Sequence, residues 1–184
     1  HRQVSALQDF AALVAAVSLE ALAAPKDAIH PALARSNEAG VAKVIERLNQ
    51  LLEGSRVTPY KLQAAISLRI IPQVHGAHLD ALDQVRSGIE QTIRTFSGNP
   101  MLVEDDGEGQ ARLLSVGSFH NQLLVNLIEY LAIATSHVVC LSERRLHRMM
   151  DENQTGLNPQ LAPRPGLDAG MVVAHKACID LVAR

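Results

Sequence analysis

The sequence contains no tryptophan and only 3% aromatic residues, although 47% of its 184 residues are hydrophobic. Its apolar residues are therefore mainly Ala, Leu, Val and Ile. These favour close packing between helices over a β-sandwich, whose strands use more aromatic residues. A chain of this length can bury a sizeable core, so we expect one domain over residues 1–184.

The chain also has few cysteines and no strong excess of charge. Cys140 and Cys178 lie far apart in apolar helical patterns, which predicts two buried free thiols in a reducing cytoplasm rather than disulfides. Lys and Arg number 17 against 19 Asp and Glu, a formal charge of −2, and no long basic run suits nucleic acid. No signal-peptide pattern is present, and polar residues interrupt the apolar runs, so we expect no membrane partner.

Several common functional motifs are missing as well. The sequence has no phosphate-binding Gly-Lys-Ser/Thr, no dinucleotide fingerprint and no Gly-x-Ser-x-Gly. His75 and His78 could share a helix face, but no third ligand is indicated nearby, so we expect no metal site. The stretch 104–109 is acidic and glycine-rich, which is typical of a surface loop.

What the sequence does contain is helical periodicity, which predicts helices over 4–24, 37–53, 77–95, 120–150 and 167–183. The expected buried face of the first carries Val4, Leu7, Ala11, Val14, Ser18 and Ala21. The clearest pattern is the heptad step of Leu124, Leu127, Leu131, Ala134, Val138 and Leu141. Thirty helical residues span roughly 45 Å, and a helix of that length needs long neighbours. We therefore predict an all-α fold, a long antiparallel helical bundle.

Short motifs in a fixed order add a more specific indication. They are Leu51-Leu52-Glu53-Gly54-Ser55, Ile66-Ser67-Leu68-Arg69, Pro72-Gln73-Val74-His75-Gly76, Gly117-Ser118-Phe119-His120 and Ser142-Glu143-Arg144-Arg145. In this order they resemble the central helical portion of the histidine and aromatic amino-acid ammonia-lyases. The fumarase and aspartase group shares the helical-bundle design, but its Gly-Ser-Ser-x-Met-Pro signature is absent.

The resemblance implies a fragment of a longer cytoplasmic protein that acts on histidine, phenylalanine or a related amino acid, assembled as a homotetramer. The family makes its electrophile, methylideneimidazolone (MIO), from an internal Ala-Ser-Gly. No Ala-Ser-Gly occurs in these 184 residues. The MIO cofactor is therefore expected in an N-terminal part, and this chain alone is expected to be inactive.

The resemblance also implies roles for three residues, all of them in substrate binding. Arg69 matches the arginine that binds the substrate carboxylate, for which a guanidinium fork is well suited. The alternative for Arg69 is an ion pair that ties its loop to a neighbouring carboxylate. Gln63 would hydrogen-bond near the amino group or the cofactor, or be an ordinary loop amide. Phe119 would pack beside the MIO ring, or belong to the core.

Other positions imply no catalytic role or depart from the family. No catalytic residue is assigned with certainty within this chain, and Glu143, Arg144 and Arg145 are expected to form structural ion pairs, because consecutive helical residues cannot converge on one atom. Ile66 replaces a tyrosine near the substrate amine and can neither donate nor accept a proton. Ala64 replaces an aspartate, and Ser118 replaces an asparagine. These changes favour the alternative that the chain belongs to an inactive homologue that serves as a scaffold or partner subunit.

Overall fold

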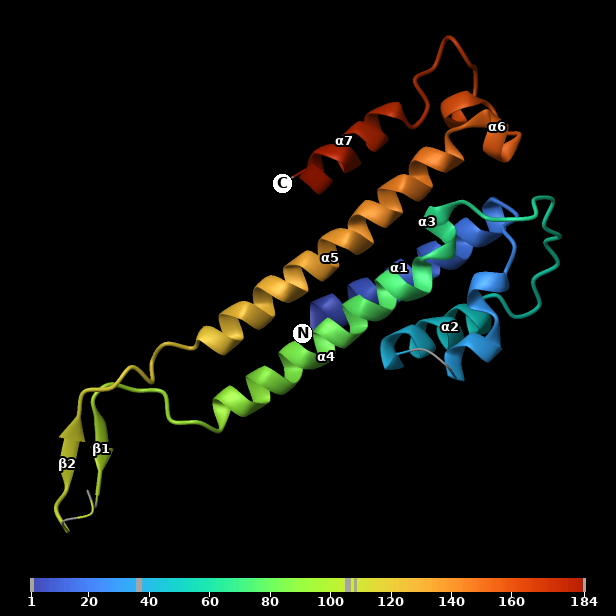
Figure 1. The fold of residues 1–184 in the computed structure, drawn as a ribbon. Helices are drawn as coiled ribbons and strands as arrows, with labels where there is room; N and C mark the ends of the chain where they lie inside the picture. The colour runs from blue at the N-terminus through green and yellow to red at the C-terminus, as the bar shows by residue number, and fades with distance from the viewer. Residues whose placement is uncertain (1, 36–37, 105–106, 108, 184) are drawn as a thin grey trace.

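The computed structural model describes residues 2–35, 38–104, 107 and 109–183, and these residues are mostly helical (Figure 1). The main helices are α1 (Arg2–Ala21), α2 (Ala39–Leu51), α4 (Ile71–Ile93), α5 (Gln122–Met149) and α7 (Val172–Ala183). Short helices are α3 (Ile66–Arg69), α6 (Glu152–Thr155) and the 3-10 turns Asp27–Ile29, Pro31–Arg35 and Pro159–Leu161. The predicted all-α fold is confirmed.

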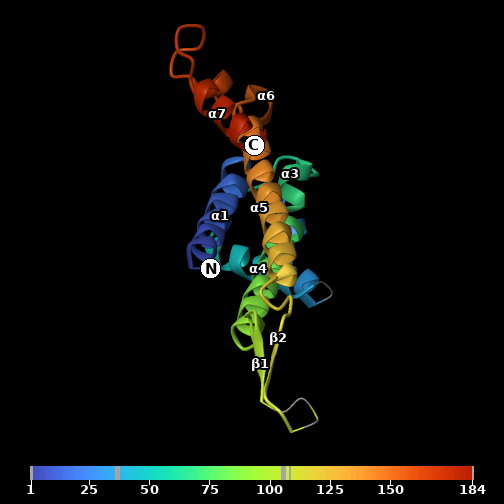
Figure 2. The same cartoon turned by 90° about the vertical axis from the view of Figure 1, so that its left-hand side faces the viewer.

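The long helices lie side by side as an antiparallel bundle. Helices α4 and α5 run in opposite directions, α1 lies beside them, and α7 folds back along the end of α5 (Figures 1 and 2). The predicted heptad face of α5 points into this packing: Ala134, Val138 and Leu141 are buried. Thr135 on the same helix bonds His78 of α4, with 3.1 Å between Oγ1 and Nε2. The heptad therefore identified the seam between α4 and α5.

The buried face of α1 agrees with the predicted one only in part: Ala11 and Ser18 are buried as predicted, but Ala21 is exposed. Ala15, Ala16 and Leu19 are buried with residues of α2 and α4, whereas Leu7 is 46% exposed. Alanines face inward because their small side chains let neighbouring helices approach closely. The larger Phe10, Leu13 and Val17 remain on the outer face.

Helix α4 begins earlier than predicted. The sequence pattern suggested a helix from residue 77, but α4 starts at Ile71 and has Pro72 in its first turn. Proline is tolerated there because its fixed φ suits the helix and its missing N–H would have no intrahelical partner. Four residues just upstream, Ile66–Arg69, add α3 to what was expected to be a connecting segment.

Two glycines set the distance between α2 and α4. A Cβ added to Gly40 would lie 2.2 Å from the carbonyl oxygen of Gly76, and one added to Gly76 would lie 2.6 Å from the backbone nitrogen of Val41. The backbones of α2 and α4 thus touch where these residues cross. This contact explains the glycine of the Pro-Gln-Val-His-Gly motif in structural terms.

A hairpin projects from the far end of the bundle, between α4 and α5 (Figures 1 and 2). Its strands, β1 (Met101–Val103) and β2 (Arg112–Leu114), pair antiparallel with Met101 opposite Leu114. Asp105, Asp106 and Glu108 of the expected acidic loop lie outside the described residues.

Two further expectations need correction. Cys140 and Cys178 are free, as expected, but both are only half-buried. By length and composition alone, the segments Gln3–Ala21 and Gln122–Met149 are apolar enough to cross a membrane, so the expectation that polar residues interrupt every long apolar run was wrong. A core helix of a water-soluble protein has the same composition, so this observation does not identify a membrane segment.

Candidate functional site

Gln63 and Arg69 lie at the end of the bundle where α3 meets the last turn of α1. Arg69 is the final residue of α3, and Gln63 lies in the loop just before that helix. Both line one cavity of about 320 Å³, together with Pro25, Asp27, Ala28, Leu62 and Ala64. The structure therefore brings together two of the three predicted substrate-binding residues.

The guanidinium of Arg69 is available to a ligand. It forms no ion pair with a carboxylate of the described residues, and its buried Nε has no hydrogen-bond partner among them. The alternative interpretation, an arginine tied to a neighbouring carboxylate, is not realised here. An unpaired guanidinium in a cavity can bind a carboxylate through two parallel charge-assisted hydrogen bonds.

Ile66 occupies the first position of α3, one turn before Arg69. Its side chain is 56% exposed rather than buried in the core. The apolar residue at the tyrosine position of the family is therefore on the surface of this chain, where it provides no group for proton transfer.

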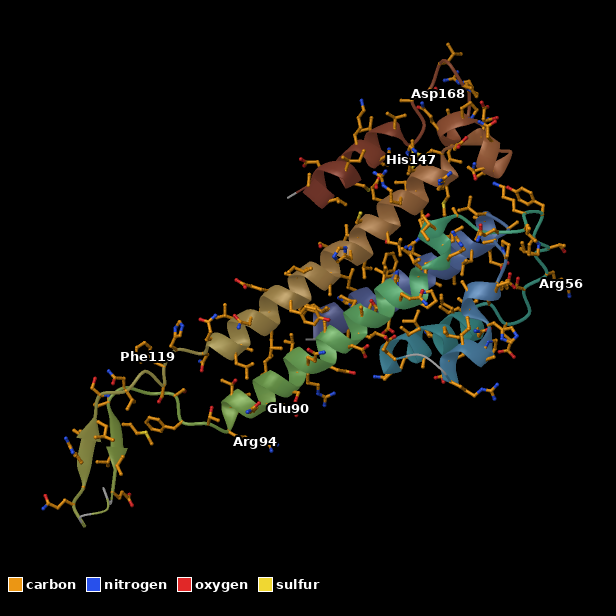
Figure 3. The ribbon with its side chains drawn as sticks, viewed as in Figure 1. Arg56, Glu90, Arg94, Phe119, His147 and Asp168 are labelled. Atoms are coloured by element: carbon orange, nitrogen blue, oxygen red, sulfur yellow. The ribbon has the colours of Figure 1, made fainter. Side chains whose placement is uncertain are left out.

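Phe119 lies at the opposite end of the molecule. It precedes α5, next to the hairpin (Figure 3). Gln63 instead lines a cavity with Arg148 in the last turn of α5, and Arg69 ends α3, which lies near that same end of α5 (Figure 1). The 28 residues of α5 span about 42 Å at 1.5 Å per residue. Phe119 is 62% exposed, so it is not core, and one copy of the chain cannot place it beside Arg69.

The Ser142–Arg145 motif forms a buried polar contact between α5 and α7. Glu143 bonds His175 of α7, with 2.6 Å between Oε1 and Nε2, and also accepts from Arg144. Burial alone would raise the pKa of Glu143, but the hydrogen bonds from Arg144 and His175 hold it below its usual value. Ion pairs between neighbouring helices were expected here; Arg144 instead pairs with Glu143 of its own helix, and the contact between helices is the one from Glu143 to His175.

For Arg145, the expected ion pair is not found among the described residues. Arg145 is 1% exposed and donates to Ser142 Oγ at 2.8 Å, but no carboxylate of the described residues pairs with it. Its Nε and Nη1 have no partner among those residues, and burial lowers its pKa to about 10.

The sequence did not predict that His75 and His78 are buried. Both are buried in α4, and neither ring nitrogen of His75 has a partner among the described residues. Burial, with the positive charge of Arg145 as a smaller cause, lowers the pKa of His75 to about 3. In the described part of the chain, no group of three or more His, Cys, Asp or Glu residues could hold a metal ion. These histidines are core residues, which their three-residue spacing alone could not show.

Solved structures of ammonia-lyases and aminomutases have the same fold as this chain. Histidine ammonia-lyase from Trypanosoma cruzi aligns with a TM-score of 0.81 and 27% identity over 96% of this chain and 33% of its own. Tyrosine aminomutase from Streptomyces globisporus aligns with a TM-score of 0.82 and 25% identity, over 96% of this chain and 38% of its own.

The sequence comparisons give the family. The profile of the aromatic amino acid lyases matches residues 2–184, and the chain belongs to that family. Histidine ammonia-lyase from Geobacillus sp. (strain WCH70) is 34% identical over 176 residues, which cover 92% of this chain and 34% of that protein. The chain thus spans about a third of the length of the curated relatives it matches.

Proposed function

We propose that the full-length protein releases ammonia from histidine or an aromatic amino acid by non-oxidative elimination. The supporting observation is the unpaired guanidinium of Arg69 in a cavity that Gln63 also lines. By the motif resemblance, both residues match substrate-binding positions of the family. The relatives named histidine ammonia-lyase make histidine the first substrate to test.

The residues of this chain bind and orient the substrate. Arg69 fixes the carboxylate by two N–H donors, and Gln63 offers an amide at the edge of the same cavity. Phe119 has an exposed ring that can pack on a flat group, and by the family resemblance it would lie beside the MIO ring. When present, the MIO group would supply the electrophile that makes the amino group a leaving group. The 184 residues supply neither that group nor an assigned catalytic base, so the chain alone is expected to release no ammonia.

We further propose that the active assembly is a homo-oligomer, a tetramer by analogy with the family. The outer face of α1 exposes Phe10, Leu13 and Val17, and α5 exposes Ile128 and Ile133. Contiguous apolar surface of this kind is seldom left in water. Association of copies would also allow Phe119 of one chain to approach Arg69 of another.

A second candidate function is a catalytically inactive homologue that acts as a scaffold or partner subunit. Ile66 and Ala64 favour it, because both replace polar residues of the family motif around the candidate site. Ammonia release from histidine, phenylalanine and tyrosine by the full-length protein decides between the two functions.

In an active full-length protein, Arg69→Lys should lower kcat/KM by about ten- to a hundredfold. Lysine keeps the charge but cannot make the two-pronged contact, and one charge-assisted bond is worth roughly 1.5–3 kcal/mol. Steady-state kinetics at matched thermal stability measure the effect. Arg56→Lys, in an exposed loop outside the cavity, is the control. Unchanged kinetics in Arg69→Lys would make Arg69 a structural residue.

If each active site uses residues from two copies of the chain, two inactive variants should recover activity when they are co-expressed. Arg69→Ala and Phe119→Ala should each lose activity, whereas co-expressed chains should regain it in about a quarter of the sites of randomly mixed oligomers. Such sites combine the intact Arg69 of one chain with the intact Phe119 of another. Purification through a different affinity tag on each variant confirms that mixed oligomers form, and their complete inactivity would contradict a shared site.

A further inference from the structure

A second cavity, of about 170 Å³, adjoins the Arg69 cavity. It lies where the end of α1, the loop before α3, the last turn of α5 and α6 come together. Pro25, Gln63 and Ala64 line both cavities and so form the wall between them. Asp27 and Arg69 line only the first, whereas Lys61, Arg148 and Gln154 line only the second.

The second cavity carries two positive charges and no negative one. Lys61 and Arg148 are half-buried, and neither Asp nor Glu is among the lining residues. Lys61 donates to Gln154 Oε1 at 2.8 Å, an amide rather than a carboxylate. Among the described residues, no carboxylate forms an ion pair with Lys61 or Arg148. Partial burial strengthens the field of both cations, because less water screens them.

Ala64 is one position in the shared wall where a carboxylate could compensate this charge. The family motif has an aspartate at this position, and Ala64 is a buried residue of the cavity wall. An aspartate there would bring a carboxylate to the cavity that holds Lys61 and Arg148. Alanine removes that carboxylate and leaves the two cations to an external ligand.

The cavity also limits the size and shape of its ligand. At 170 Å³ it is smaller than the roughly 300–1,000 Å³ typical of pockets for drug-sized molecules. Its donors come from three separate elements: Lys61 from the loop, Arg148 from α5 and Gln154 from α6. A tetrahedral oxyanion offers oxygens in several directions and so matches donors from separate elements better than a planar carboxylate does.

We propose that this cavity binds a small, doubly charged oxyanion of the phosphate or sulfate type. The site is separate from the Arg69 cavity and independent of whether the protein is catalytically active.

Titration of the full-length protein with inorganic phosphate by calorimetry, at constant ionic strength, tests the proposal. We expect saturable binding that sulfate competes for and acetate does not. Arg148→Gln and Lys61→Gln should each weaken it about tenfold or more, as expected when a charge-assisted contact is lost. Ala64→Asp, which restores the family residue, should weaken it at least as much. Higher salt should also weaken binding.

Two control variants separate binding in this cavity from general attraction to positive charge and from binding at Arg69. Arg56→Gln removes a positive charge from the same exposed loop without touching the cavity, so phosphate binding should be unchanged. Arg69→Gln should also leave it unchanged. Absence of saturable binding in the unaltered protein, normal binding in folded Ala64→Asp and Arg148→Gln, or loss of binding in Arg69→Gln would each overturn the proposal.

Discussion

Replacing Gly76 by valine should lower the free energy of unfolding by roughly 3 kcal/mol or more, because it forces α2 and α4 apart. Even a Cβ at this position would lie 2.6 Å from the backbone nitrogen of Val41 and 2.8 Å from its Cα. Backbone atoms cannot turn away as a side chain can, so the whole helix must shift. Urea unfolding followed by circular dichroism, at one fixed protein concentration, measures the loss.

Alanine at two glycines of α4 provides the matched comparison. Gly76→Ala should cost about 2 kcal/mol, since the overpacking exceeds the gain of roughly 1 kcal/mol in helix propensity. Gly88→Ala should be nearly neutral, because the Cβ would meet only the side chain of Leu127, whose flexible end, Cδ1, lies at 2.3 Å and whose Cγ lies at an ordinary 3.8 Å. Equal effects at both positions would show that the crossing of α2 and α4 is not the constraint.

The helices were predictable where one apolar face repeats over many turns. The heptad of α5 gave both its length and its buried seam, since Ala134, Val138 and Leu141 recur at helical spacing and pack on α4. The start of α4 was missed because Pro72 was interpreted as the end of a connecting segment, although proline is equally suited to a first helical turn. Local patterns cannot separate these two uses of proline.

The candidate site was predictable only through the motif. Composition and periodicity alone do not single out Arg69, whereas the order of the short motifs did, and the structure then placed Arg69 with Gln63 in one cavity. Phe119 could not be located in this way, because the order of motifs along the chain does not show how far apart they lie in the fold: Phe119 precedes α5, at the end opposite to Arg69. The exposed Phe10, Leu13 and Val17 show the same limit: sequence indicates an apolar helix but not which face a partner covers.

His75, the buried histidine of the Pro-Gln-Val-His-Gly motif, should make the stability of the fold sensitive to acid. Burial lowers the pKa of His75 to about 3 in the folded chain, whereas the unfolded chain should titrate near the ordinary value of about 6.5. Above pH 6.5 both states are neutral at this residue, and it contributes no pH dependence. Below pH 6.5 only the unfolded state takes up the proton, so stability falls as the pH falls. The loss attributable to His75 should reach about 2 kcal/mol at pH 5.

His75→Leu should remove this part of the acid sensitivity. Leucine does not titrate, and at pH 7.5 the exchange should change stability little, because neither ring nitrogen of His75 has a partner among the described residues to lose. The measurement is urea unfolding of both proteins at pH 7.5, 6.0 and 5.0, with exposed His137→Gln as the control. Burial also lowers the pKa of His78, so some acid sensitivity should remain in His75→Leu. Parallel loss of stability in the original and His75→Leu proteins would show that His75 is protonated without unfolding, and that the polar interior between α4 and α5 admits a proton.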